Sequence, residues 1–184
     1  MNPFVFGKTV SGKNYCERPE QEKLLKSYLQ AGQNVLLQGD RRVGKTSLAS
    51  KVAGSIRGKR VLYADFMFCN EARDVTEQIA KAVLKVASEG GFLQKAMTTL
   101  SSLRPTMTLD ESTGKPSFSV SIESKLNNTP ETIEQALDAL STIHAKDPLI
   151  VIFDEFQDVL RLPDHNRILA RMRSRIQFQE SLSY

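Results

Sequence analysis

The sequence contains few of the residues that build disulfide frameworks or metal sites. Among 184 residues there are 2 cysteines and 2 histidines. Cys16 and Cys69 show no metal-ligand spacing and suggest no disulfide framework, so we expect both to be reduced thiols. His144 and His165 have no partners at ligand spacing, and neither is a good candidate for a metal ligand.

Long apolar runs and a strong charge bias are also missing. No run approaches the length that spans a bilayer, and residues 1–7 lack a basic leader followed by an apolar segment. The net charge of +4 is mild and does not by itself argue for nucleic acid. We therefore expect one soluble, cytoplasmic domain over residues 1–184, with no membrane partner.

The most informative segment is residues 39–46, GDRRVGKT, which fits the phosphate-binding pattern G-x-x-x-x-G-K-[ST] at every fixed position. The short apolar segment Asn34–Gln38 before it predicts a strand, and residues 47–53 after it predict a helix. Strand, glycine loop and helix is the context that this pattern requires. The alternative is a surface loop that contains two glycines and a lysine by chance.

In a phosphate loop, Gly39 and Gly44 let backbone N–H groups turn inward toward the phosphates. Lys45 would place its ammonium between the β- and γ-phosphates, and the Thr46 hydroxyl would ligate Mg²⁺. The predicted nucleotide-binding residues of the loop are Gly39, Asp40, Arg41, Arg42, Val43, Gly44, Lys45, Thr46 and Ser47.

A second element lies about a hundred residues further on, at Leu149–Glu155. Its unbroken apolar run predicts a strand buried on both faces, as in a parallel sheet. Asp154 would then lie at the carboxyl end of that strand, beside the phosphate loop, where it could hold Mg²⁺ through water in the Walker B role. Glu155 is the candidate to orient and deprotonate an attacking water. The alternative for the acidic pair is the N-cap of a following helix.

Further elements alternate along the chain. Helices are predicted over residues 18–29, 72–88, 129–143 and 164–180, and a strand over residues 60–66. Residues 1–16 read as a lid or strap. Residues 92–128 contain two β-arms around Gly114, which predicts a hairpin insertion outside the main sheet. The predicted fold class is therefore α/β: a three-layer P-loop NTPase, a parallel sheet with helices on both faces, plus a small β-hairpin insertion.

The two motifs resemble those of the prokaryotic AAA-like ATPases of the archaeal-ATPase and STAND group. GDRRVGKTSL is similar to the form G-x-R-R-x-G-K-T-S-L, and IVIFDEFQDV is similar to the strand of that group that ends in D-E-[FA]-Q. Residues 15–22 resemble its F-x-x-R-x-x-E box near the adenine, which makes Arg18 a nucleotide-binding candidate. The resemblance implies ATP as the nucleotide, Mg²⁺ as the metal, and a switch driven by the nucleotide.

The resemblance breaks off after the Walker B strand. Such cores continue to a strand with a polar sensor residue and then to a lid domain, whereas this sequence reaches Tyr184 one helix beyond the acidic pair. We therefore expect a truncated core that binds ATP. We expect hydrolysis of ATP to be affected more than its binding, because each electrostatic donor lost with the sensor strand and lid costs on the order of 10²–10³ in rate.

Other polar residues leave alternatives open. Asp65, at the end of its strand, could approach Mg²⁺ or make a capping or loop hydrogen bond, and the latter is favoured. Gln157 could orient water or begin a solvated helix. Arg167, Arg171 and Arg175 share one helix face, which could contact nucleic acid, offer an arginine finger to a second subunit, or be solvated.

Three functions remain open at this point. The first is an ATP switch that binds Mg·ATP through Lys45, Thr46 and Asp154, with Glu155 supporting slow hydrolysis; homo-oligomers or a partner protein would fit such a switch. The second is a nucleic-acid-binding module that ATP regulates, through the arginine helix and the hairpin. The third is a protein-interaction scaffold with a non-hydrolysing site.

Overall fold

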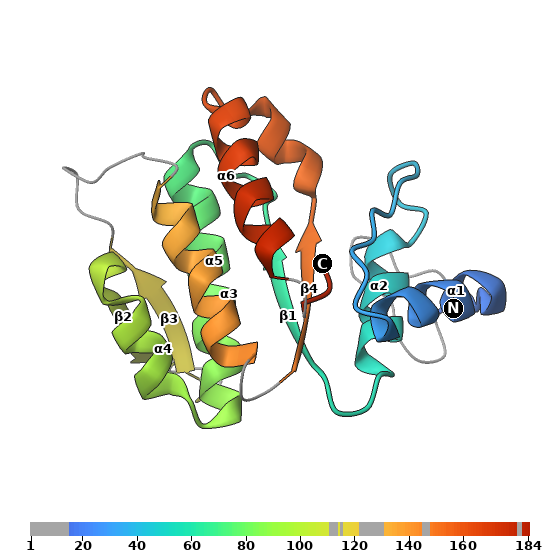
Figure 1. Ribbon diagram of the computed structural model, residues 1–184, viewed down its shortest axis with the longest axis horizontal. Helices are drawn as coiled ribbons and strands as arrows, with labels where there is room; N and C mark the ends of the chain where they lie inside the picture. The colour runs from blue at the N-terminus through green and yellow to red at the C-terminus, as the bar shows by residue number, and fades with distance from the viewer. Residues whose placement is uncertain (1–14, 111–113, 115, 122–130, 145–147, 180–181) are drawn as a thin grey trace, which may run out of the picture.

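The computed structural model describes residues 15–110, 114, 116–121, 131–144, 148–179 and 182–184. Two parallel strands form a central layer, and helices cover both of its faces (Figure 1). The elements are α1 (Pro19–Gln30), α2 (Lys45–Gly54), β1 (Arg60–Asp65), α3 (Ala72–Gly90), α4 (Leu93–Thr99), η2 (Ser101–Leu103), β2 (Pro105–Leu109), β3 (Pro116–Val120), α5 (Glu131–His144), β4 (Leu149–Asp154), η3 (Phe156–Arg161) and α6 (His165–Phe178). The α/β class with a small hairpin is confirmed.

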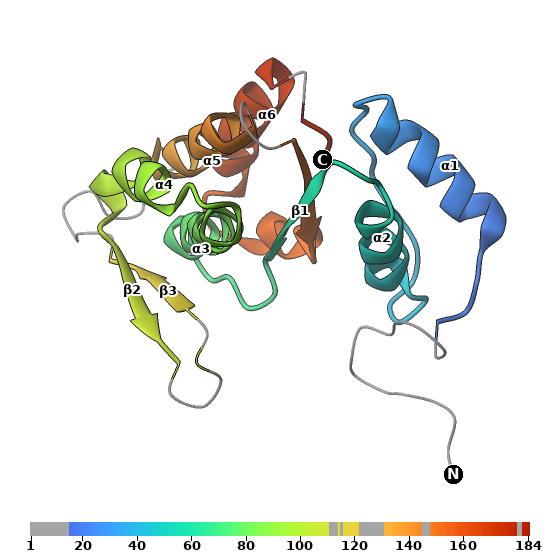
Figure 2. The same ribbon diagram turned by 90° about the horizontal axis from the view of Figure 1, so that it is seen from below.

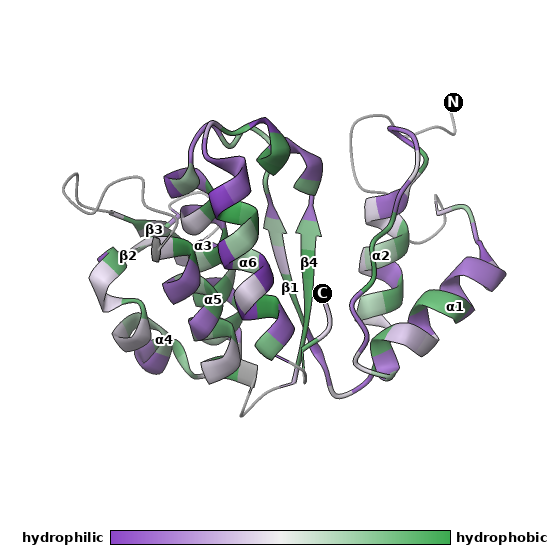
Figure 3. Ribbon diagram, turned by 45° about the horizontal axis from the view of Figure 1, so that its top comes forward, coloured by the Kyte–Doolittle hydropathy of each residue, from purple (hydrophilic) through white to green (hydrophobic). Residues whose placement is uncertain are grey.

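The strands β1 and β4 pair in parallel, with Arg60 opposite Leu149 and Asp65 opposite Asp154. Because they are parallel, both end in an acidic residue at the same edge of the sheet. Alternate residues point to opposite faces, so each strand contributes apolar side chains to a core on either side. The hydropathy colouring shows this apolar centre between more polar outer surfaces (Figure 3).

One core lies between the sheet and the helices α1 and α2. Leu25 and Leu29 of α1 pack with Leu48 and Val52 of α2 and with Ile150 of β4. The amphipathic pattern of α1 brings this about, since Leu25 and Leu29 lie one turn apart on the same face. This core places the first turn of α2 next to the carboxyl end of β4.

The larger core lies on the other face of the sheet. The helices α3, α4, α5 and α6 contribute to it. Among others, Ile79, Leu137 and Ile168 of α3, α5 and α6 are buried with Leu62 and Val151 of the strands. The helix α3 ends where predicted: Gly91 takes the left-handed conformation, with φ 77°, that glycine adopts readily. The helices α5 and α6 agree with the sequence prediction to within a few residues.

The insertion forms a separate antiparallel sheet, in which Pro105 pairs with Val120 and Leu109 pairs with Pro116. Figure 2 shows it beside α3, away from β1. Phe118 and Val120 of β3 are buried in the larger core, whereas Met107 and Leu109 of β2 are exposed. The predicted hairpin outside the main sheet is therefore confirmed for the described residues.

The strand predicted over Asn34–Gln38 is not formed. No regular secondary structure is assigned to residues 33–40. The Val35 amide donates to the Tyr184 carbonyl at 2.8 Å, and Ser183 makes an isolated parallel bridge with Ile150. Residues 182–184 thus lie between this segment and the amino half of β4. Closer to the phosphate loop, this segment forms no ladder of backbone hydrogen bonds with β4. Leu36 in the segment is accordingly 72% exposed.

Several predictions fall on residues that the structure does not describe. These are residues 1–14 of the lid or strap, most of the hairpin turn, and residues 129–130 at the predicted start of the helix that is α5. In the described part of the chain, no helix is long and apolar enough to cross a membrane. Cys16 and Cys69 form no disulfide with one another, and burial raises the pKa of the Cys69 thiol to about 12.

Candidate functional site

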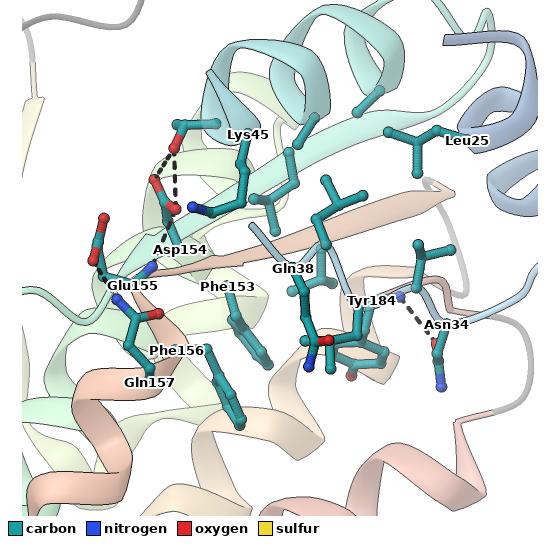
Figure 4. A pocket seen from close by; sticks show the side chains of 18 of the residues that line it. Leu25, Asn34, Gln38, Lys45, Phe153, Asp154, Glu155, Phe156, Gln157 and Tyr184 are labelled. Carbon is teal, nitrogen blue, oxygen red and sulfur yellow. Dashed lines mark hydrogen bonds between the residues drawn. The ribbon is translucent and has the colours of Figure 1, made fainter. Parts of the chain in front are cut away.

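A cavity of about 890 Å³ opens between the phosphate-loop segment and β4. This volume lies within the range of small-molecule sites. Its polar end is lined by Lys45, Thr46, Asp154 and Glu155. Its apolar part is lined by residues of the 34–38 segment, β4 and η3, including Leu37, Phe153 and Phe156, and by Tyr184. Figure 4 shows Lys45, Asp154 and Glu155 gathered at one end of this cavity, with Phe153, Phe156 and Tyr184 further along it.

The loop leading into α2 has the backbone that the glycine pattern requires. Gly39 has φ 155° and Gly44 has φ 83°, and both values lie in the region that glycine adopts readily. Arg42 between them also has a positive φ of 66°. Gly44 is the N-cap of α2 and makes no side-chain cap. The amino end of this helix therefore has no capping side chain from its N-cap residue, and the N–H groups at such a helix end favour an anion.

Lys45 is the first residue of α2, and its side chain turns back over the loop. Its ammonium donates to the carbonyl oxygens of Gly39 and Asp40 at 2.9 and 2.8 Å. These contacts hold the positive charge over the loop. A phosphate oxygen is a stronger acceptor for an ammonium than a neutral carbonyl oxygen, so these hydrogen bonds are exchangeable.

The second residue of α2 contacts the end of β4. The Thr46 hydroxyl lies 2.8 Å from Oδ2 and 3.1 Å from Oδ1 of Asp154. The two residues are 108 positions apart in the sequence. The fold thus brings together the Thr46 hydroxyl and the Asp154 carboxylate, the two groups that the sequence analysis assigned to Mg²⁺.

Asp154 has two further contacts. The Glu155 amide donates to Oδ1 at 3.1 Å, and the hydroxyl of Tyr63 on β1 lies 2.5 Å from Oδ2. Burial first, and then the neighbouring carboxylates led by Asp154, raise the pKa of Tyr63 above its ordinary range. The hydroxyl therefore stays protonated and acts as a donor. Sequence reasoning missed Tyr63 because an aromatic residue within an apolar strand is typical of a core. The available signal was that Tyr63 lies two residues before Asp65 and so points to the same face of the strand.

Glu155 follows β4 in the left-handed conformation, with φ 49°. This conformation is uncommon for a residue with a Cβ, and it turns the chain sharply out of the strand into η3. The Gln157 amide donates to the Glu155 carboxylate. Both side chains line the cavity. Glu155 occupies the N-cap position of η3, as the capping alternative for the acidic pair allowed, but its side chain makes no capping hydrogen bond.

The remaining loop residues occupy the following places. Arg41 lines the cavity, Val43 is partly exposed, and Ser47 is buried in the first turn of α2. The Arg18 guanidinium donates to the Val43 carbonyl, and its backbone amide donates to Glu22 at 3.0 Å. Arg18 thus connects the start of α1 to the phosphate loop.

Two other groups of charged residues make contacts within the protein. The Asp65 carboxylate accepts a hydrogen bond from the Met67 amide at 2.8 Å, which is the loop hydrogen bond that the sequence favoured. On α6, Arg171 and Arg175 lie 2.8 and 2.9 Å from the carboxylate of Glu134 on α5. These two arginines therefore stabilise the contact between α5 and α6.

The residues present fit a phosphate-bound magnesium ion. Mg²⁺ is usually held by one or two protein oxygens together with phosphate oxygens and waters. Thr46 and Asp154 provide such a pair beside the loop. Among the described residues there is no cluster of three or more His, Cys, Asp or Glu side chains that could hold a metal without a ligand.

Comparison with known proteins assigns the chain to a family. No curated protein and no solved structure gives a significant match to the chain. A family model, described as AAA domain, matches residues 2–176. Domains of this type are P-loop ATPase-like and bind nucleotide, usually with Mg²⁺. The match spans the phosphate loop, both parallel strands, the hairpin and nearly all of α6, and the chain accordingly belongs to the AAA domain family.

Proposed function

We propose that residues 1–184 form an ATP-binding, Mg²⁺-dependent switch domain of the AAA-like group that includes the archaeal-ATPase and STAND proteins, with slow hydrolysis of ATP. The observation that carries the proposal is the approach of Thr46 to Asp154 at 2.8 Å beside the Lys45 ammonium. Two motifs distant in the sequence meet at one end of a cavity of ligand size.

Each residue has a defined part in this function. The N–H groups at the start of α2 and the Lys45 ammonium bind the phosphates, with Lys45 exchanging the carbonyls of Gly39 and Asp40 for phosphate oxygens. Thr46 and Asp154 hold Mg²⁺, which neutralises charge on the phosphates. The Glu155 carboxylate first gives up its hydrogen bond from Gln157 and then takes the proton of the attacking water.

The first experiment is a titration of the protein with a fluorescent ATP analogue, with and without Mg²⁺ and with GTP as competitor. Lys45→Ala should weaken binding by roughly 30- to 700-fold, because exchanging two carbonyl for two phosphate acceptors is worth about 2–4 kcal/mol. Lys51→Ala is the matched control. It removes the same charge from the same helix, but Lys51 pairs with Glu22 at 3.1 Å and is away from the loop.

Two results would contradict nucleotide binding at this site. One is an absence of saturable binding by the folded protein, and the other is an equal effect of Lys45→Ala and Lys51→Ala. Hydrolysis is tested separately with Glu155→Gln, which should keep the affinity and reduce turnover by about 10²–10⁴-fold. Unchanged turnover in that variant would remove Glu155 from the mechanism.

A further inference from the structure

The contact between Tyr63 and Asp154 joins β1 to the polar end of the cavity. The tyrosine hydroxyl lies 2.5 Å from Oδ2 of Asp154. Neither the phosphate-loop motif nor the acidic motif includes Tyr63. The residue is 40% exposed, so its ring is not simply part of the packed core.

The register of the sheet explains why these two side chains meet. Tyr63 lies opposite Ile152, and Asp154 lies two residues further along β4. Residues two apart on a strand point to the same face, so Tyr63 and Asp154 both face α2. A diagonal pair of this kind is within reach of an aromatic side chain.

The donors around Asp154 fix the plane of its carboxylate. The Glu155 amide contacts Oδ1 at 3.1 Å and the Tyr63 hydroxyl contacts Oδ2, so each oxygen has its own donor from a different part of the chain. The Thr46 hydroxyl faces both oxygens. A carboxylate has about four lone-pair sites, which leaves acceptor capacity toward the cavity.

We infer that Tyr63 is a positioning residue for the metal site, whose hydroxyl holds the Asp154 carboxylate in the orientation that serves Mg²⁺. The inference rests on the proposed function, because it requires Mg²⁺ to bind with the nucleotide. Tyr63 acts through its hydrogen bond to Asp154. Partners of this kind typically contribute 10- to 100-fold in metal affinity.

The test measures the gain in nucleotide affinity on adding Mg²⁺. The fluorescent ATP analogue is titrated in EDTA and in saturating Mg²⁺, for the unmodified protein, Tyr63→Phe and Tyr28→Phe. Tyr63→Phe should leave the affinity in EDTA within about twofold and reduce the gain about tenfold, the low end of the range, because Thr46 and the Glu155 amide remain. Tyr28 on α1 is the matched control, since it is also 40% exposed.

A double-mutant cycle with Asp154→Asn tests the route of the effect. If Tyr63 acts through the carboxylate, Tyr63→Phe should change the gain little in the Asp154→Asn background. Equal losses with and without Mg²⁺ would indicate a packing role and overturn the inference, as would an unchanged gain. An unmodified protein that binds nucleotide equally with and without Mg²⁺ would overturn it while nucleotide binding stands. If the unmodified protein does not bind nucleotide, the proposed function fails and this inference fails with it.

Discussion

Alanine should have opposite effects on stability at the two glycines that lie at the ends of α2. Gly44 is the N-cap of this helix, with φ 83°, and Gly54 is its last residue. An alanine Cβ at Gly44 would meet the Arg18 guanidinium at 3.5 Å, which is ordinary van der Waals contact. Its cost therefore comes from the backbone: about 1–2 kcal/mol for holding a residue with a Cβ in the left-handed region.

At Gly54 the added Cβ meets nothing within 4 Å, and the backbone is helical. Alanine there should stabilise the protein by about 0.4–1 kcal/mol, because it restricts the unfolded chain without strain in the folded one. The two variants should thus differ by roughly 1.5–3 kcal/mol, which is about 3–12 °C in Tm for a domain of this size.

Thermal and urea unfolding followed by circular dichroism would measure this difference, since both variants make the same chemical change. Gly44→Ala should in addition weaken nucleotide binding, because it moves the first N–H groups of α2, whereas Gly54→Ala should not. If Gly44→Ala were as stable as Gly54→Ala, the left-handed conformation of the loop would not be required, and the argument for the phosphate cradle would be refuted.

Two further predictions concern the larger core and its surface. Burial alone would raise the pKa of Glu134, but hydrogen bonds and charge from Arg171 and Arg175 on α6 outweigh it, so the pKa of Glu134 is lowered. The contribution of Glu134 to stability is therefore present above its ordinary pKa of 4.5 and is lost as the pH falls through the lower pKa of the folded state. Unfolding measurements should therefore give a cost for Glu134→Gln of no more than about 1 kcal/mol at pH 7, because the arginines are partly solvated, and this cost should shrink as the pH falls below 4.5. A cost independent of pH would contradict this. Phe66 is fully buried and its ring lies 5.2 Å from that of Phe153 and 6.1 Å from that of Phe156. Phe66→Ala should destabilise the protein by about 3–5 kcal/mol in urea unfolding, and a loss below 1 kcal/mol would show that this cluster does not support the end of β4.

The parts of the fold that the sequence predicted correctly have strong local signals. The helix α2 follows a glycine loop whose spacing is fixed by chemistry, and β4 is an unbroken apolar run ending in acids. The wrong prediction, a strand over Asn34–Gln38, depended on a signal that is not local. An apolar segment becomes a strand only where another strand supplies hydrogen bonds. Apart from Tyr184, no residue in the described part of the chain pairs with the backbone of this segment.

The site depended on non-local information in the same way. The sequence indicated Thr46 and Asp154 separately, but their approach results from α2 packing against the strands through the core that contains Leu48, Val52 and Ile150. Tyr63 is 91 residues from Asp154 in the sequence, and only the pairing of β1 with β4 brings them together. Likewise, the arginine stripe on α6 has a local periodicity, whereas its acidic partner Glu134 lies on another helix.

The register of β1 against β4 therefore determines the geometry at Asp154. A slip of one residue would turn Tyr63 to the opposite face of the sheet, among the helices α3 and α5, and would move Leu62 out of its core. Leu62 is fully buried in that core, so the slip would expose apolar surface to water and place a hydroxyl in an apolar layer. The packing of Leu62 on one face thus holds Tyr63 at Asp154 on the other. Core residues that never touch a nucleotide fix the position of the donor that we assign to the metal site.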